Sequence, residues 1–284
     1  MMNLEEKRLA LKPLPDYIDK EYGIQMCNDS YQNWKSHGIN AKAQLILSDI
    51  PYAIGTDAYG SNPMWYEGGD NANGESKLAG KAFFDTDYTF KVKEFLHFST
   101  QMLRPEPKDN SGGKTIGKNG KTSGGAPCMI IFCSFEQQFQ LIETAKEFGF
   151  KNYINLVFRK NYSAQVLKAN MRPVGNCEYA VLLYRNRLPK FNNYGQMIFN
   201  CLDWIRDTKT LKIHPTQKSV PMLEMLIKIF TDEGDVVIDP CAGSGTTLLA
   251  AANLKRKAYG FEIKKDIFKD ATTKILPYIQ RQLF

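Results

Sequence analysis

The chain of 284 residues has few histidines, no Cys-x-x-Cys pair and no long hydrophobic run. It contains three histidines and six scattered cysteines, namely Cys27, Cys128, Cys133, Cys177, Cys201 and Cys241. We therefore expect reduced thiols and no metal site. No apolar stretch reaches the roughly 18–20 residues that cross a bilayer, and the first residues are mixed in charge. We expect no membrane segment and a cytoplasmic location.

Positive charge is concentrated in one part of the chain. The stretch from Lys151 to Ser219 has twelve basic and three acidic residues, a net charge of +9, whereas the whole chain carries +7. Several tyrosines and Trp204 are interleaved with these cations. Basic and aromatic side chains together are typical of a nucleic-acid-binding surface. A solvated basic face over an aromatic core has the same composition, so both interpretations remain open here.

Apolar segments predict a sheet whose strands alternate with helices. We expect strands at about 22–29, 43–49, 127–134, 152–159, 178–184, 235–240 and 257–263, and helices at 30–37, 87–103, 136–147, 219–231, 244–254 and after 264. Near-continuous apolar strands indicate an α/β fold with a mainly parallel sheet. Only one helix follows the last strand, so the strand that ends at Asp29 is expected to pair beside it. Residues 53–85 and 105–126 are polar and glycine-rich and predict long loops.

The strand at 43–49 ends in Asp49-Ile50-Pro51-Tyr52. The Asp49 carboxylate and the Ile50 carbonyl can accept two hydrogen bonds from a planar aromatic amine, and Tyr52 can stack on its ring. Pro51 restricts the backbone that carries the Ile50 carbonyl. Such acceptors stabilise the positive charge that develops when the amine acts as a nucleophile. The alternative is a strand-end turn with a capping aspartate.

A glycine-rich turn, Asp239-Pro240-Cys241-Ala242-Gly243-Ser244-Gly245-Thr246-Thr247, follows a second apolar strand. Exposed amides at the start of the next helix can bind a carboxylate. Glu262 ends the following strand about twenty residues later, where an acidic residue can accept both hydroxyls of a ribose. The spacing is neither that of a P-loop nor G-x-G-x-x-G. A glycine turn that binds no ligand is the alternative.

Together the two turns resemble those of the exocyclic-amine DNA methyltransferases that use S-adenosylmethionine, in the subgroup whose catalytic motif precedes its cofactor motif. The stretch His214-Pro215-Thr216-Gln217-Lys218-Ser219 is similar to the family's His-Pro-Thr-Gln-Lys-Pro element. The chain departs from the family at three positions. Ile50 stands where the first proline is usual, Cys241 where phenylalanine is frequent, and Ser219 where the last proline occurs.

The resemblance implies catalytic roles for Asp49, Ile50, Pro51 and Tyr52, with the target base flipped out of the duplex. It implies that S-adenosylmethionine is bound by the turn, by Glu262 and by the segment before helix 219–231. We expect Lys218 to meet the cofactor's carboxylate. Asp29 is either an acceptor for the cofactor's adenine or a helix cap. The predicted cofactor-binding residues are Asp29, Lys218, Asp239, Cys241, Gly243, Gly245, Thr246 and Glu262.

The resemblance also implies a Rossmann-like methyltransferase fold with helices on both faces of the sheet. We expect residues 1–159 to be the catalytic part, 160–212 an inserted target-recognition region, and 213–284 the cofactor-binding part. In the basic segment we expect Arg172, Arg185 and Arg187 to contact double-stranded DNA. A homodimer and a companion restriction endonuclease are further partners that such enzymes can have.

Aspartate at position 49 favours adenine N6 as the methylated atom, and cytosine N4 is the alternative because the same pocket suits either amine. A catalytically silent nucleic-acid-binding module of the same fold is a second alternative. The intact Asp49, Tyr52 and Glu262 argue against it. A methyltransferase acting on protein or small molecules is a weaker interpretation, because the basic segment would then lack a purpose.

Overall fold

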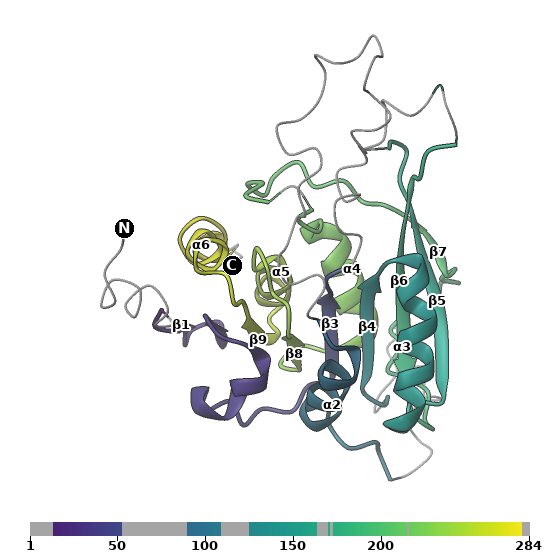
Figure 1. Ribbon diagram of the computed structural model, residues 1–284, viewed down its shortest axis with the longest axis horizontal. Coiled ribbons are helices and arrows are strands. Elements are labelled where there is room, and N and C mark those ends of the chain that lie inside the picture. Colours follow the sequence, from purple (N-terminus) through teal and green to yellow (C-terminus); the bar gives the residue numbers. More distant parts are fainter. Residues whose placement is uncertain are drawn as a thin grey trace.

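The computed structural model describes residues 14–52, 90–108, 125–163, 170, 173–214 and 216–279. Within these residues nine strands form one sheet in the order β1-β2-β9-β8-β3-β4-β6-β5-β7 (Figure 1). The strands are β1 Tyr17–Asp19, β2 Ile24–Cys27, β3 Leu45–Asp49, β4 Cys128–Cys133, β5 Asn152–Arg159, β6 Cys177–Tyr184, β7 Cys201–Asp203, β8 Val236–Asp239 and β9 Lys257–Phe261.

The sheet is mostly parallel, as the apolar strands predicted. Strand β1 runs antiparallel to β2, and β6 runs antiparallel to both of its neighbours, β4 and β5. The other described pairings are parallel. Strand β2 pairs with β9 through Ile24 and Ala258, which confirms that the strand before Asp29 lies beside the last strand. The reversal of β6 has consequences for the site described below.

Helices cover both faces of the sheet (Figure 1). They are η1 Tyr31–His37 (3-10), α2 Val92–Met102, α3 Phe135–Glu147, α4 Val220–Phe230, α5 Thr246–Asn253 and α6 Lys265–Asp270, which continues as η5 Ala271–Ile275 (π) and η6 Leu276–Tyr278 (3-10). Within the described residues, no helix combines the length and the apolar character that a bilayer span requires.

The strict alternation of side chains along the central strands builds two hydrophobic cores. On β3, Leu45 and Leu47 contact the core that includes α4 and α5, whereas Ile46 belongs to the core that includes α2 and α3. Neighbouring β4 divides its residues in the same way, with Ile130 in one core and Ile131 in the other. Burying each such side chain contributes about 1.5–3 kcal/mol, so the two cores fix the central strand ends firmly.

Some local predictions need correction. The helix expected after Asp29 is a 3-10 helix, and the stretch 185–213 that was expected to be irregular contains β7, which pairs with β5 through Val157 and Cys201. Strand β1 was also not predicted. The expected loop 53–85 and most of 105–126 lie outside the described residues. The division into catalytic, recognition and cofactor-binding parts stays a prediction.

Candidate active site

A cavity of about 750 Å³ lies where β3, β8 and β9 end. Asp49, Asp239 and Glu262 line it, each at or just after the last residue of its strand. The side chains before and after α4's first turn complete one wall. Ligands in open α/β sheets bind outside the carboxyl ends of the strands, and a volume of 300–1,000 Å³ is typical of small-molecule sites. The two motifs predicted to meet therefore share one cavity.

The Asp49–Tyr52 turn is held by its neighbours on two sides. The Ile50 amide donates to the Phe132 carbonyl at 3.2 Å, and Ile50 itself is buried in the core. Gln137 Nε2 donates to the Pro51 carbonyl at 2.7 Å. Gln137 also forms the capping box of α3 with Ser134, so the start of that helix and the turn are fixed together. An isoleucine suits position 50 because its side chain packs inward.

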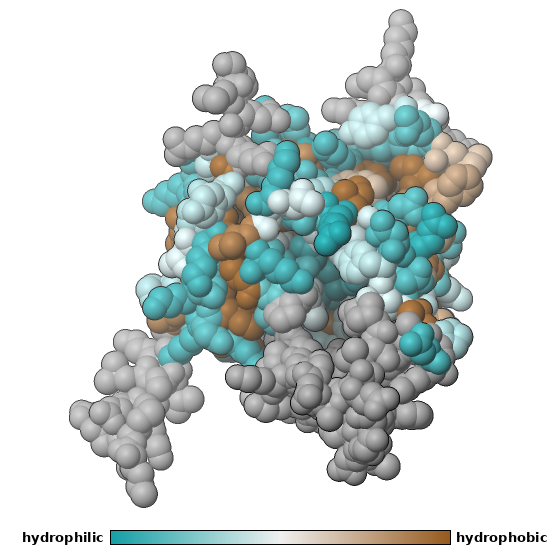
Figure 2. Space-filling view, turned by 90° about the horizontal axis from the view of Figure 1, so that it is seen from above, coloured by the Kyte–Doolittle hydropathy of each residue, from teal (hydrophilic) through white to brown (hydrophobic). Residues whose placement is uncertain are grey.

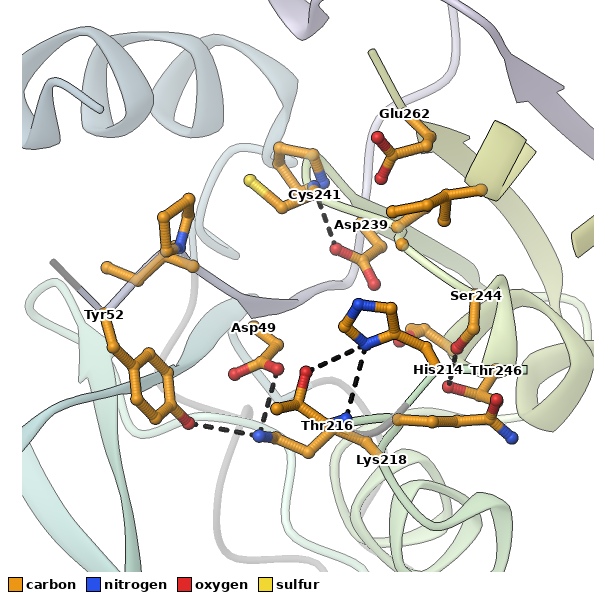
Figure 3. A pocket seen from close by; sticks show the side chains of 18 of the residues that line it. Asp49, Tyr52, His214, Thr216, Lys218, Asp239, Cys241, Ser244, Thr246 and Glu262 are labelled. Atoms are coloured by element: carbon orange, nitrogen blue, oxygen red, sulfur yellow. Dashed lines mark hydrogen bonds and ion pairs between the residues drawn. The ribbon is translucent and has the colours of Figure 1, made fainter. Parts of the chain in front are cut away.

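The ammonium of Lys218 joins three groups at one end of the cavity (Figure 3). Its Nζ lies 3.0 Å from Asp49 Oδ2 and 2.9 Å from Glu178 Oε2, and it donates to the Tyr52 hydroxyl at 3.1 Å. Burial alone disfavours a charged lysine, but the two carboxylates hold the pKa of Lys218 well above its usual range. Lys218 is therefore charged at any ordinary pH.

Asp49 keeps one oxygen for a ligand. While Oδ2 pairs with Lys218, Oδ1 is buried and has no hydrogen-bond partner among the residues that the structure describes. Burial raises the pKa of Asp49, Lys218 lowers it, and Glu178 raises it again, with a net upward shift. An unsatisfied buried acceptor is costly unless a donor arrives. The arrangement suits an incoming N–H group.

The glycine-rich turn is shaped by its backbone and by Asp239. Gly243 and Gly245 have φ of +49° and +76°, which disfavour any other residue, and Gly245 caps α5. Asp239 Oδ1 accepts from the Ser48 hydroxyl at 2.7 Å and from the Cys241 amide at 3.1 Å. Burial raises the pKa of Asp239 to about 6. Asp239 thus ties β8 to β3 and shapes the turn that Cys241, Gly243 and Thr246 present to the cavity.

Glu262 lies at the opposite side of the view from Tyr52, with Asp49 and Asp239 between them (Figure 3). Its Oε1 accepts from the Lys264 amide at 2.7 Å. Burial raises the pKa of Glu262 to about 7, although the backbone amides of Lys264 and Gly243 oppose the shift. A carboxyl group at this position can accept hydrogen bonds from two neighbouring hydroxyls.

The segment from His214 to Ser219 forms a turn that carries Lys218 into the cavity. The Gln217 side chain accepts from the Ile213 amide at 3.1 Å and donates to the Leu211 carbonyl at 2.9 Å. Ser219 caps α4, which explains how serine can replace a proline here. The expected contact of Lys218 with the cofactor's carboxylate is not favoured by this arrangement, because two protein carboxylates already neutralise the ammonium.

Asp29 and Gly245 are absent from the cavity lining. Gly245 acts through the backbone of the turn. The Asp29 carboxylate accepts from the Ser30 amide at 2.7 Å and from Asn33 Nδ2 at 2.8 Å, and its other oxygen lies 3.1 Å from His37 Nε2. These contacts fit the capping interpretation of Asp29. The adenine-binding role stays a prediction.

Residues 43–273 match the sequence pattern of the N6/N4 DNA methylase family, described as "DNA methylase". The chain belongs to this family. It is 30% identical over 135 residues to "Putative methylase YubD" of Escherichia coli K12, covering 48% of this chain and 56% of that protein. It is 29% identical over 138 residues to "DNA adenine methyltransferase YhdJ" of the same organism, covering 48% and 42%. The chain thus matches about half the length of these curated relatives.

Solved structures of two methyltransferases share the methylase fold. The M1.HpyAVI–SAM complex has a TM-score of 0.58 and 23% identity over 89% of this chain and 99% of that one. The PvuII DNA methyltransferase, described as cytosine-N4-specific, has a TM-score of 0.58 and 14% identity over 92% and 88%. These likenesses confirm the predicted methyltransferase fold. They do not decide between the two target bases.

Sequence reasoning missed a group of methylase residues that line the cavity opposite the glycine turn. Glu178, Lys160, Tyr162, Trp204 and Arg206 come from β5, β6 and the segment around β7. The Lys160 ammonium lies 4.5 Å from the Trp204 ring centroid, and the Arg206 guanidinium 5.6 Å from that of Tyr162. The signal available in sequence was that Glu178 is one of only three acidic residues in the basic segment.

Two arginines expected to contact DNA lie far from this cavity along the sheet. Because β6 runs antiparallel to β4, its last residues are at the opposite edge of the sheet from Asp49. Arg185 donates to the Arg104 and Thr100 carbonyls, and Arg187 donates to the Lys108 carbonyl. Arg172 lies outside the described residues.

One group of possible metal ligands occurs among the described residues, at Asp16, Cys27 and His37. Asp16 Oδ2 accepts from Gln25 Nε2 at 2.9 Å, and His37 Nδ1 lies 2.9 Å from the same carboxylate. Burial, with nearby Asp16, raises the pKa of the Cys27 thiol far above its usual range. The group is thus a hydrogen-bonded network with a protonated thiol, which does not suit a cation.

Proposed function

We propose that this methylase transfers a methyl group from S-adenosylmethionine to the exocyclic amine of a base in double-stranded DNA, with adenine N6 as the target. The observation that carries the proposal is the Asp49 carboxylate, which keeps one buried oxygen without a partner among the described residues, at the end of a cavity whose other end carries Glu262. Membership of the N6/N4 DNA methylase family supports the choice of reaction.

The described residues fit this cofactor. The Gly243–Thr246 turn would hold its amino-acid part by backbone amides, and Glu262 would accept from the ribose hydroxyls. The S-adenosylmethionine sulfonium, when bound, supplies an electrophilic methyl group. The neighbours M1.HpyAVI and TTHA0409 of Thermus thermophilus have been solved with this cofactor, the latter at a TM-score of 0.52 and 17% identity.

At the other end of the cavity, Asp49 Oδ1 would accept one N–H of the target amine, and the Ile50 carbonyl the other. These contacts favour a nitrogen whose lone pair points toward the methyl carbon. The nitrogen–carbon bond forms as the carbon–sulfur bond breaks, with its electron pair left on sulfur. The proton that the methylated nitrogen loses can pass to Asp49, whose pKa burial raises. Tyr52 would stack on the base.

A base within a duplex cannot reach Asp49, so it must leave the stack. The cavity wall formed by Lys160, Tyr162, Trp204, Arg206 and Lys212 offers cations and aromatic rings to the flipped nucleotide and its neighbours. This wall supports residues 160–212 as the recognition region. The face in Figure 2 is mainly hydrophilic with separate hydrophobic patches, and the exposed Tyr162, Tyr194 and Phe199 are candidates for base stacking.

The direct test is nucleoside analysis of plasmid DNA treated with protein and cofactor. N6-methyladenine supports the proposal as stated. N4-methylcytosine would keep the reaction class and change the base. Neither product, from protein that binds the cofactor, would favour a silent DNA-binding module.

A further inference from the structure

Glu178 is a buried carboxylate at the start of β6 that none of the sequence motifs contains. In a parallel strand this residue would lie at the far edge of the sheet. Because β6 is reversed, with Tyr179 opposite Cys133, Glu178 lies at the same edge as Asp49. It lines the cavity together with Asp49 and Lys218.

Glu178 divides its two oxygens between two cations. Oε2 lies 2.9 Å from the Lys218 ammonium, and Oε1 accepts from Lys160. Lys218 in turn lies 3.0 Å from Asp49 Oδ2. The two carboxylates and two ammoniums thus form a neutral chain that joins β3, β5, β6 and the start of α4. Burial alone raises the pKa of Glu178, but the two lysines lower it overall, so Glu178 is ionised at neutral pH.

We propose that Glu178 is a positioning residue for the methyl transfer, which fixes Lys218 so that Asp49 stays ionised with one oxygen available to the target amine. The inference rests on the proposed function. Without a second carboxylate, the Lys218 ammonium is free to swing onto both oxygens of Asp49 and to occupy the site of the amine. Glu178 anchors the ammonium on its far side, and Asp49 Oδ1 has no partner among the described residues.

Glu178 also sets the basicity of Asp49. The charge of Lys218 makes Asp49 a weaker proton acceptor, and the charge of Glu178 restores part of that loss, because Lys218 lowers the pKa of Asp49 and Glu178 raises it. An ion pair with Lys218 alone would hold Asp49 as a poor base. The pairing with two carboxylates keeps the lysine as an anchor while limiting this cost.

The test compares Glu178→Gln with wild type by single-turnover methyl transfer to DNA between pH 5 and 9. We expect cofactor affinity within about twofold, and a transfer rate at neutral pH at least about tenfold lower, the loss of one charged hydrogen bond. The acidic limb of the rate profile should move about one unit toward lower pH, because a neighbouring negative charge is gone. The matched control is Glu143→Gln, an exposed carboxylate on α3 outside the cavity.

An unchanged rate and acidic limb in Glu178→Gln would overturn the inference. A joint loss of cofactor affinity and thermal stability would overturn it too, in favour of a packing role. If Glu178→Gln does not fold, Glu178→Asp keeps the charge with a shorter reach. It should lower the rate without moving the limb, and a wild-type rate would refute the inference. A wild-type protein that methylates neither base would refute the proposed function itself, and with it this inference.

Discussion

Replacing Glu262 by glutamine should stabilise the cofactor-free protein while weakening cofactor binding. Burial raises the pKa of Glu262 from 4.5 to about 7. The folded state therefore holds a proton that the unfolded chain releases near pH 4.5, and folding loses stability as the pH rises from there through 7. The full difference corresponds to about 3 kcal/mol above pH 7. Glutamine has the same shape and can keep the hydrogen bond from Lys264, but it carries no charge to penalise.

The assay is thermal unfolding of the cofactor-free wild type and Glu262→Gln at pH 5 and pH 8.5. Each kcal/mol moves the melting temperature by about 2–4 °C in a domain of this size, so the variant should melt several degrees higher at pH 8.5 and equally at pH 5. Calorimetric titration should show cofactor affinity lower by roughly ten- to hundredfold. An equal gain at both pH values, or no gain at pH 8.5, would refute the argument that a buried carboxylate is held there for the ligand.

Further predictions follow from the cavity wall and from the network at the sheet's other end. Arg206→Gln with Lys212→Gln should lower the log–log salt slope of DNA binding by about 0.9 for each phosphate that the protein no longer neutralises, whereas the slope of the control Arg187→Gln should equal that of wild type; equal slopes in all three proteins would exclude this wall. Burial lowers the pKa of His37, but hydrogen bonds with Asp29 and Asp16 raise it overall. His37→Gln should therefore cost on the order of 1 kcal/mol near pH 6, and this cost should shrink as the pH rises through the raised pKa. Melting curves in which the cost grows toward pH 8.5 would contradict that assignment.

Much of the fold could be predicted because the central strands carry unbroken apolar runs. The partner of the last strand was also accessible, since a sheet with one strand missing leaves few candidates. Strands β1 and β7 were not, because three residues show no periodicity and each strand exists only through pairing with β2 or β5. The helix after Asp29 was expected, but seven residues ending at Gly38 settle as a 3-10 helix.

The candidate site was predictable where a strand and its motif sit together, as at Asp49 and Glu262. It was not predictable where strand direction decides the outcome. The reversal of β6 brings Glu178 to the cavity and carries Arg185 to the opposite edge of the sheet, and the sequence contains no local signal for that reversal. The partners of Lys218 depend on the same fact, so its contacts were expected at the cofactor rather than at Asp49.

The central claim is that Asp49 acts on the target amine and not on the cofactor. The most direct measurement is single-turnover transfer of labelled methyl to plasmid DNA by wild type and Asp49→Ala, with cofactor affinity measured in parallel. The account predicts N6-methyladenine from wild type. It also predicts a transfer rate about 10²–10³-fold lower in the variant, as for loss of a group that stabilises transition-state charge, with cofactor affinity within a few-fold. A parallel loss of cofactor affinity, or a variant that transfers methyl at the wild-type rate, would contradict it.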